Sequence, residues 1–82
     1  MIRVLFLAQL REQLGASELQ VPAADIGSVA DLTQYLLKEN SGWEQFLSNR
    51  KLLVAINHEY AKSDARVKVG DEFALFPPVT GG

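Results

Sequence analysis

The sequence contains no cysteine, a single histidine and no excess of basic residues. Without cysteine the chain forms no disulfide and no thiolate metal site, and no side-chain thiol can act as a nucleophile or hold a sulfur atom. The net charge of −2 at pH 7 gives no electrostatic reason to expect nucleic acid or an anionic membrane as a partner. Any sulfur chemistry would therefore have to use the backbone terminus.

Long hydrophobic runs and nucleotide-binding motifs are missing as well. No apolar stretch reaches the roughly 18 residues of a membrane-spanning helix. Residues 1–8 lack a small-residue cleavage site, so we expect a strand of a cytoplasmic protein rather than a signal peptide. Neither a G-x-G-x-x-G motif nor a Walker loop occurs. His58 has no ligands at zinc-site spacing and no nucleophile elbow to support a triad, so we expect neither a metal site nor a stand-alone enzyme.

The composition indicates one small folded domain. Hydrophobic residues make up 48% and charged residues 22% of the 82 positions, which is typical of a globular chain with a core and argues against disorder. A domain of this size is only marginally stable by itself, so burial against a partner would stabilise it further.

Short segments of alternating or continuous apolar residues predict the strands. The pattern indicates strands at 1–8, 17–22, 60–62 and 72–76. Residues 52–57 are nearly all apolar, which predicts a central strand buried on both of its faces.

Three segments have helical spacing. Residues 9–14 predict a short helix that ends at Gly15. Ser28 is a candidate N-cap for the main helix at 29–40, which carries an apolar stripe. The aromatic and apolar residues within 43–47 predict one or two further helical turns that belong to the core.

This order of elements predicts an α+β domain with a four- or five-stranded sheet and one helix across one face. A turn is expected at 48–50, before the strand at 52–57. Because side chains alternate between the two faces of a strand, Leu5, Leu7, Leu53 and Phe76 are expected on the sheet face opposite the helix. Such an apolar patch usually marks a binding surface, although these residues could instead be scattered or covered by the C-terminal segment.

The C-terminal segment, residues 77–82, opens with two prolines and closes with two glycines. The prolines stiffen the exit from the globular unit at 1–76, and the glycines add no width. Extended, this segment would reach roughly 20 Å from the body. We expect a flexible tail whose Gly82 carboxylate is presented to another protein's active site, the alternative being a frayed end.

The opening residues 1–8 and the closing residues 69–82 resemble the small, sulfur-carrying subunits of molybdopterin synthase. This family is related to the thiamine sulfur carrier and to ubiquitin. The resemblance spans the whole chain, and its most specific part is the Pro-Pro-Val-Thr spacer before the diglycine. It implies a β-grasp, ubiquitin-like fold: a mixed sheet covered by one main helix and shorter helices.

The resemblance also implies a mechanism. An activating enzyme of the ubiquitin-activating type would use ATP to adenylate the Gly82 carboxylate, which a sulfur donor would convert to a thiocarboxylate. Inside the large synthase subunit, the sulfur would pass to cyclic pyranopterin monophosphate to form the dithiolene of molybdopterin. The resemblance implies a heterotetramer of two small and two large subunits. It places the catalytic residues on the large subunit, and no cofactor stably on this chain.

The resemblance assigns roles to individual residues. Gly82 is the reactive end. The tail residues expected to enter a partner are Pro77, Pro78, Val79, Thr80 and Gly81. The residues expected at the partner interface are Leu5, Leu7, Arg11, Leu53 and Phe76, of which Arg11 and Phe76 match family positions that contact the activating enzyme. Because both partners would take the same tail, we expect the two complexes to exclude each other.

Two other classes of function stay open at this point. One is a different ubiquitin-like carrier, which would serve thiamine synthesis or tRNA thiolation, or a protein modifier attached to lysines through Gly82. The other is a passive binding module whose tail has no chemical role.

Overall fold

The computed structural model describes residues 1–47 and 52–78. The predicted turn at 48–50 and tail positions 79–82 lie outside the described residues. The elements are β1 (Ile2–Phe6), α1 (Gln9–Leu14), β2 (Glu18–Val21), α2 (Val29–Glu39), the 3₁₀ turn η1 (Ser41–Trp43), α3 (Glu44–Leu47), β3 (Leu53–Ile56), β4 (Glu59–Ala61) and β5 (Glu72–Phe76). The predicted strands and helices are therefore confirmed: α1 and β5 have the predicted bounds, β4 begins and ends one residue earlier, and β1, β2, β3 and α2 are shorter than predicted.

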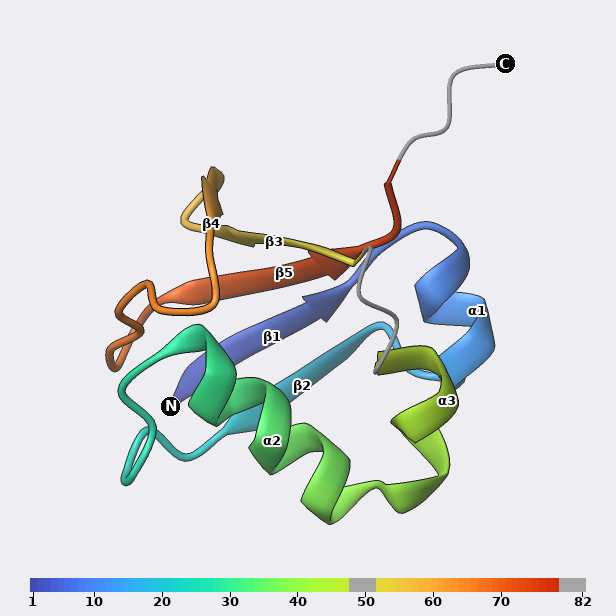
Figure 1. Ribbon diagram of the computed structural model, residues 1–82, viewed down its shortest axis with the longest axis horizontal. Coiled ribbons are helices and arrows are strands. Elements are labelled where there is room, and N and C mark those ends of the chain that lie inside the picture. The colour runs from blue at the N-terminus through green and yellow to red at the C-terminus, as the bar shows by residue number, and fades with distance from the viewer. Residues whose placement is uncertain (48–51, 79–82) are drawn as a thin grey trace.

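The strands form one mixed sheet of five, in the order β2-β1-β5-β3-β4. β1 and β5 run parallel at the middle of the sheet, while the other neighbouring pairs are antiparallel. The main helix α2 lies across one face of the sheet (Figure 1). The predicted two-layer α+β architecture is thus confirmed.

The prediction of a central, doubly buried strand at 52–57 is wrong. That segment is β3, which lies next to the edge strand β4, and all its residues are only half-buried. The central strand is β5, where Phe73, Ala74 and Leu75 are buried in succession. A continuous apolar run shows that a strand has apolar side chains on both of its faces. It does not show whether each face is covered by a helix or is left exposed as an apolar surface.

Local sequence explains where the helices begin and end. The Ser28 hydroxyl accepts a hydrogen bond from the Asp31 amide at 3.2 Å, and the Asp31 carboxylate accepts one from the Gly27 amide at 3.0 Å. The first bond satisfies a donor that the first turn of α2 leaves unpaired, and the second fixes the residue before the N-cap against that turn. Helix α1 ends at Gly15, whose φ of 71° is the left-handed conformation that glycine adopts without strain. Both predicted boundaries are confirmed.

The core lies between the sheet and the helices. Its largest fully buried side chains are Ile2, Val4, Phe6, Leu10, Val21, Leu32, Leu36 and Phe73. Trp43 packs edge-on against Phe6, with ring centroids 5.3 Å apart. Trp43 therefore packs against the core, as its helical spacing predicted. The helix α2 covers only one face of the sheet, so the opposite face is formed by the side chains of the strands.

Candidate functional site

Strand pairing brings apolar side chains together on the face of the sheet that α2 does not cover. Leu53 lies opposite Phe76, and Leu5 lies opposite Ala74. Residues opposite one another in neighbouring strands point to the same face. We call this surface the apolar patch; it consists of Leu5, Leu53, Ala55, Tyr60, Ala74 and Phe76. Of the predicted group Leu5, Leu7, Leu53 and Phe76, strand pairing confirms Leu5, Leu53 and Phe76 on one face, whereas Leu7 follows the end of β1 and belongs to no strand pair. Contact of these residues with a partner stays a prediction.

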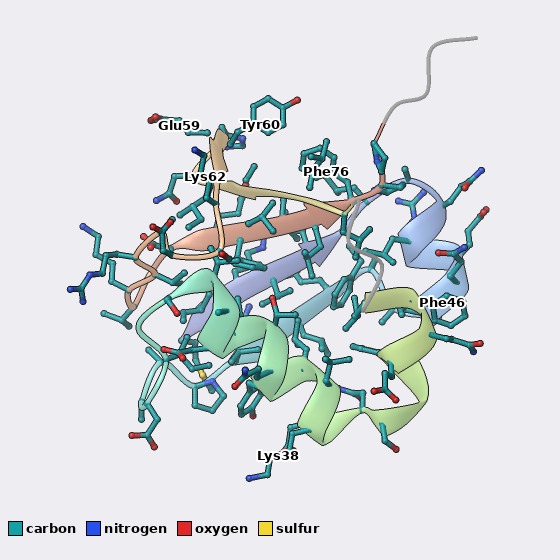
Figure 2. All side chains as sticks on the ribbon, viewed as in Figure 1. Lys38, Phe46, Glu59, Tyr60, Lys62 and Phe76 are labelled. Carbon is teal, nitrogen blue, oxygen red and sulfur yellow. The ribbon has the colours of Figure 1, made fainter. Side chains whose placement is uncertain are left out.

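Tyr60 is the most exposed member of the patch and was not predicted as a site residue. It pairs with Ala55 across β3 and β4, and its ring centroid lies 6.0 Å from that of Phe76. Figure 2 shows both rings on the side of the sheet away from α2. The Tyr60 side chain is 78% exposed, and together with Ala55, His58 and Phe76 it lines a shallow hollow. The signal in the sequence was an aromatic residue within a three-residue edge strand, which by itself indicates only a strand.

A cluster of hydrogen bonds fixes the hairpin that carries Tyr60. Asn57 and His58 have φ values of 51° and 72°, as a tight two-residue hairpin requires. The Asn57 side-chain Nδ2 donates to the Asp71 carboxylate at 3.0 Å, and the Asn57 side-chain oxygen accepts from the Glu72 backbone amide at 3.1 Å. Asp71, only 5% exposed, also accepts from the Lys68 amide at 2.9 Å. The turn between β3 and β4 is thereby attached to the start of β5.

The chain leaves the sheet beside the apolar patch. β5 ends at Phe76, and Pro77 and Pro78 follow as half-buried residues without regular structure. Helix α1 lies near this end of β5 and carries the exposed Arg11 (Figure 1). Leu7 follows β1 directly and is 40% exposed. The predicted interface residues thus lie on elements around the start of the C-terminal segment.

The predicted tail residues beyond Pro78 lie outside the described residues. They are Val79, Thr80, Gly81 and Gly82. Their roles, the division of the chain after Phe76 and the spacer role of Pro77 and Pro78 stay predictions.

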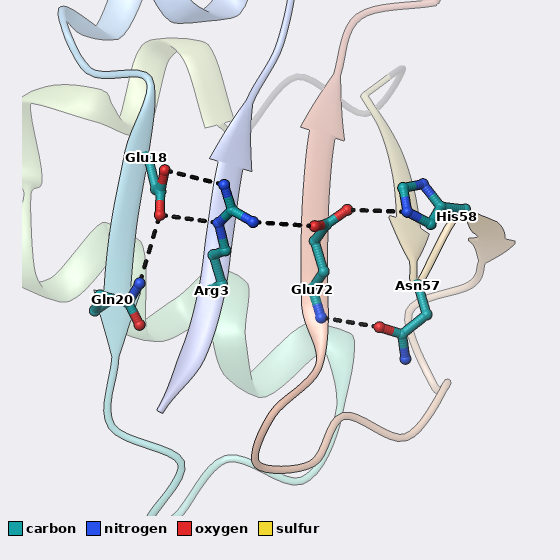
Figure 3. Close-up of polar contacts among 6 residues, drawn as sticks. All are labelled: Arg3, Glu18, Gln20, Asn57, His58 and Glu72. Atoms are coloured by element: carbon teal, nitrogen blue, oxygen red, sulfur yellow. Dashed lines mark hydrogen bonds and ion pairs between the residues drawn. The ribbon is translucent and has the colours of Figure 1, made fainter.

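Charged side chains occupy the other half of the same sheet face. Arg3 contacts Glu18 through Nε at 2.9 Å and Glu72 through Nη1 at 3.4 Å. His58 Nε2 lies 3.4 Å from the second carboxylate oxygen of Glu72. Figure 3 shows these contacts crossing the sheet, with Gln20 beside Glu18. The hydrogen bond and the charge of Glu18, with a smaller contribution from Glu72, raise the pKa of Arg3.

Side-chain chemistry is sparse in the part of the chain that the structure describes. Within residues 1–47 and 52–78, no group of three or more acidic, histidine or cysteine side chains is placed to hold a metal ion. None of the helices there has the length and apolar character needed to cross a bilayer. Among the described residues, the candidate functional surface is the sheet face that α2 does not cover, which has an apolar half and a charged half.

Comparison with known proteins places these features in a family context. Residues 4–82 match the ThiS family. The chain is 44% identical over 82 residues to the molybdopterin synthase sulfur carrier subunit of Escherichia coli K12, and the match covers 100% of both chains.

Solved structures share the fold. The small archaeal modifier protein 1 of Haloferax volcanii superposes with a TM-score of 0.79 at 26% identity, over 95% of this chain and 97% of that chain. A Helicobacter pylori complex of subunits 1 and 2 of molybdopterin-converting factor gives a TM-score of 0.68 at 23% identity, over 99% and 97% of the two chains. These neighbours confirm the predicted β-grasp, ubiquitin-like fold.

Proposed function

The chain belongs to the ThiS family and to the molybdopterin synthase sulfur carrier subunits, and on this premise we propose that Gly82 carries the sulfur as a C-terminal thiocarboxylate. The observation that carries the proposal is that this chain, which matches a sulfur carrier subunit from end to end, contains no cysteine. A transferable sulfur atom therefore needs a position other than a side-chain thiol. The α-carboxyl group after two glycines provides that position.

Activation of Gly82 requires a second protein and ATP. A carboxylate is a poor electrophile, so one of its oxygens first attacks the α-phosphorus of ATP and releases pyrophosphate. The terminal sulfur of a persulfide then attacks the acyl carbon, and AMP leaves. A thiol cleaves the resulting S–S bond and leaves the thiocarboxylate. An adenylyltransferase of the ubiquitin-activating type supplies the site for these steps.

Sulfur transfer takes place in the large subunit of the synthase. The tail enters that subunit, and the thiocarboxylate sulfur attacks a carbon of cyclic pyranopterin monophosphate, so that a C–S bond forms as a C–O bond of that carbon breaks. Water then releases the Gly82 carboxylate, and two such transfers build the dithiolene. The groups that move protons in this reaction belong to the large subunit, which forms a heterotetramer of two small and two large subunits with this chain. The small subunit contributes the sulfur and its placement.

The apolar patch is the surface by which both partners hold the carrier. Phe76 is a member of the patch and also the last residue of β5 before Pro77 and Pro78. A protein that buries the patch therefore binds immediately beside the start of the tail. Because both partners need this surface and the same carboxyl group, their complexes exclude each other. A ternary complex in which one carrier chain binds both partners would contradict this.

A second candidate function is protein modification. The likeness to a small archaeal modifier protein favours it, because the acyl-adenylate of Gly82 could also react with a lysine amine to form an amide bond. The two functions differ in the acceptor. A modifier would be found conjugated to other proteins through Gly82, whereas the proposed carrier restores a molybdoenzyme defect and not a thiamine or tRNA-thiolation defect.

Intact mass spectrometry tests the proposed chemistry. The full chain is incubated with the activating enzyme, ATP and a persulfide donor, and the C-terminal peptide is then sequenced. We expect a mass increase that corresponds to replacement of one oxygen by sulfur, located at Gly82 and absent when ATP is omitted. No ATP-dependent change, or a change located elsewhere in the chain, would contradict the proposal.

A further inference from the structure

The charged half of the open sheet face consists of side chains of alternating charge that contact one another across the strands. Glu18, Arg3, Glu72 and His58 form a row from β2 across β1 and β5 to the β3–β4 turn (Figure 3). We call this row the charged strip. The Arg3 and Glu18 side chains are 51% and 40% exposed. Ion pairs this exposed contribute only about 0–1 kcal/mol to stability, so replacing one of these residues should leave the fold intact.

The charged strip and the apolar patch are parts of one continuous surface. Along β5, Glu72, Ala74 and Phe76 point to the same face because side chains alternate with a period of two. Along β1, Arg3 belongs to the strip and Leu5 to the patch. The face is therefore charged where β5 begins and apolar where β5 ends beside the tail. A partner large enough to cover the patch also meets the strip.

The charged strip contains more carboxylate groups than guanidinium groups. Its two carboxylates outnumber its one guanidinium, so its net charge is negative while His58 is neutral. Arg3 uses its Nε, Nη1 and Nη2 groups on the two carboxylates. Each carboxylate still has lone pairs that can accept further hydrogen bonds. The strip is thus pre-arranged to receive additional donors.

We propose that the charged strip is the polar rim of the partner face, and that the large synthase subunit covers it with basic side chains that meet Glu18 and Glu72. Interfaces commonly surround an apolar centre with a polar rim, and complementary charge there governs association rate and choice of partner. This inference rests on the proposed function, because it takes the large subunit as the protein that covers the patch. The strip aligns that subunit along β5, toward the tail.

Two charge-removing substitutions with opposite expected effects test the proposal. Association of the full chain with the purified large subunit is measured at several salt concentrations for wild type, Glu72→Gln and Arg3→Gln. We expect Glu72→Gln to weaken binding about two- to fivefold, the range of an exposed ion pair, and to reduce the salt dependence. Arg3→Gln makes the strip more negative, so we expect it to strengthen binding by a similar factor.

Glu39→Gln provides a matched control, because this exposed residue ends α2 in the layer on the other side of the sheet. It removes the same charge and should leave affinity within the error of wild type. Equal affinity of wild type and Glu72→Gln, or a weakening by Arg3→Gln, would overturn the proposal while leaving the proposed function intact. Failure of wild type to bind the large subunit at all would instead contradict the proposed function, and the strip's role would fall with it.

Discussion

At the scale of single residues, the proposed reactive group is distinct from the groups proposed to bind a partner. We propose that Gly82 holds the sulfur, whereas Tyr60 and Phe76 form the aromatic part of the patch. Aromatic residues at the centre of an interface often carry a large part of the binding energy. Since Tyr60 is 78% exposed, it contributes little to the core, so its effects on folding and on binding can be measured separately.

Tyr60→Ala should therefore reduce partner affinity without unfolding the protein. We expect a loss of about tenfold or more in affinity for the large subunit, as for an aromatic hot-spot residue, and a change in the free energy of unfolding within about 0.5 kcal/mol. Isothermal titration calorimetry and urea denaturation measure the two quantities. Val69→Ala, at a position 66% exposed outside the patch, is the control. Unchanged affinity of Tyr60→Ala would rule out the patch as the binding surface.

At the scale of elements, sequence periodicity and capping residues predicted most of the fold. Ser28 and Gly15 fixed helix boundaries because they act through bonds to near neighbours in the chain. The period of two correctly placed Leu5, Leu53 and Phe76 on one face. By contrast, the sheet order and the central place of β5 depend on pairing between distant segments, which no local pattern encodes.

Tyr60 and Asn57 were missed for the same reason, because their roles depend on contacts between distant segments. Tyr60 reaches the site only because the β3–β4 hairpin turns it onto the patch. The bonds from Asn57 to Asp71 and Glu72 join positions 14 and 15 residues apart. Their sequence signal was a turn motif and an acidic pair, which are common in loops. Tertiary contact, rather than composition, gives these residues their role.

Replacing Asn57 tests the contribution of this turn. We expect Asn57→Ala to lower the free energy of unfolding by about 2–4 kcal/mol, because it leaves the buried Asp71 carboxylate short of a donor and forces alanine to a positive φ. Asn57→Gly removes the same hydrogen bonds but tolerates the backbone conformation, so it should be less destabilising by about 1 kcal/mol. Chemical denaturation compares them. Equal stability of alanine and glycine variants would show that backbone strain is absent.

At the scale of the whole molecule, we propose that the β-grasp body serves to present the C-terminal carboxyl group to a partner. The central strand β5, which is paired on both of its edges, leads directly into Pro77 and Pro78. In the proposed function, a partner that covers the patch, the strip and the start of the spacer thereby places the terminal group. This arrangement explains how a chain with little side-chain chemistry can take part in a sulfur-transfer reaction.

Deletion of Gly82 distinguishes binding to the large subunit from sulfur transfer. The shortened chain should keep the melting temperature of wild type and still bind the large subunit, because the patch and the strip are intact. Its end would be displaced by about 3.5 Å, the length of one residue. A misplacement of only about 1 Å can slow a positioned reaction 100-fold, so we expect sulfur transfer to fall at least that far. Full activity of the shortened chain would favour a passive binding module instead.

The most direct test of the central claim is cofactor assembly by a chain whose Gly82 carboxylate no longer exists. An alanine is appended after Gly82, and conversion of cyclic pyranopterin monophosphate is measured with the large subunit, the activating enzyme, ATP and a persulfide donor. Intact mass spectrometry checks that the extra residue is not trimmed. The account predicts binding as in wild type and no dithiolene formation above background. Dithiolene formation at the wild-type rate by the untrimmed chain would contradict it.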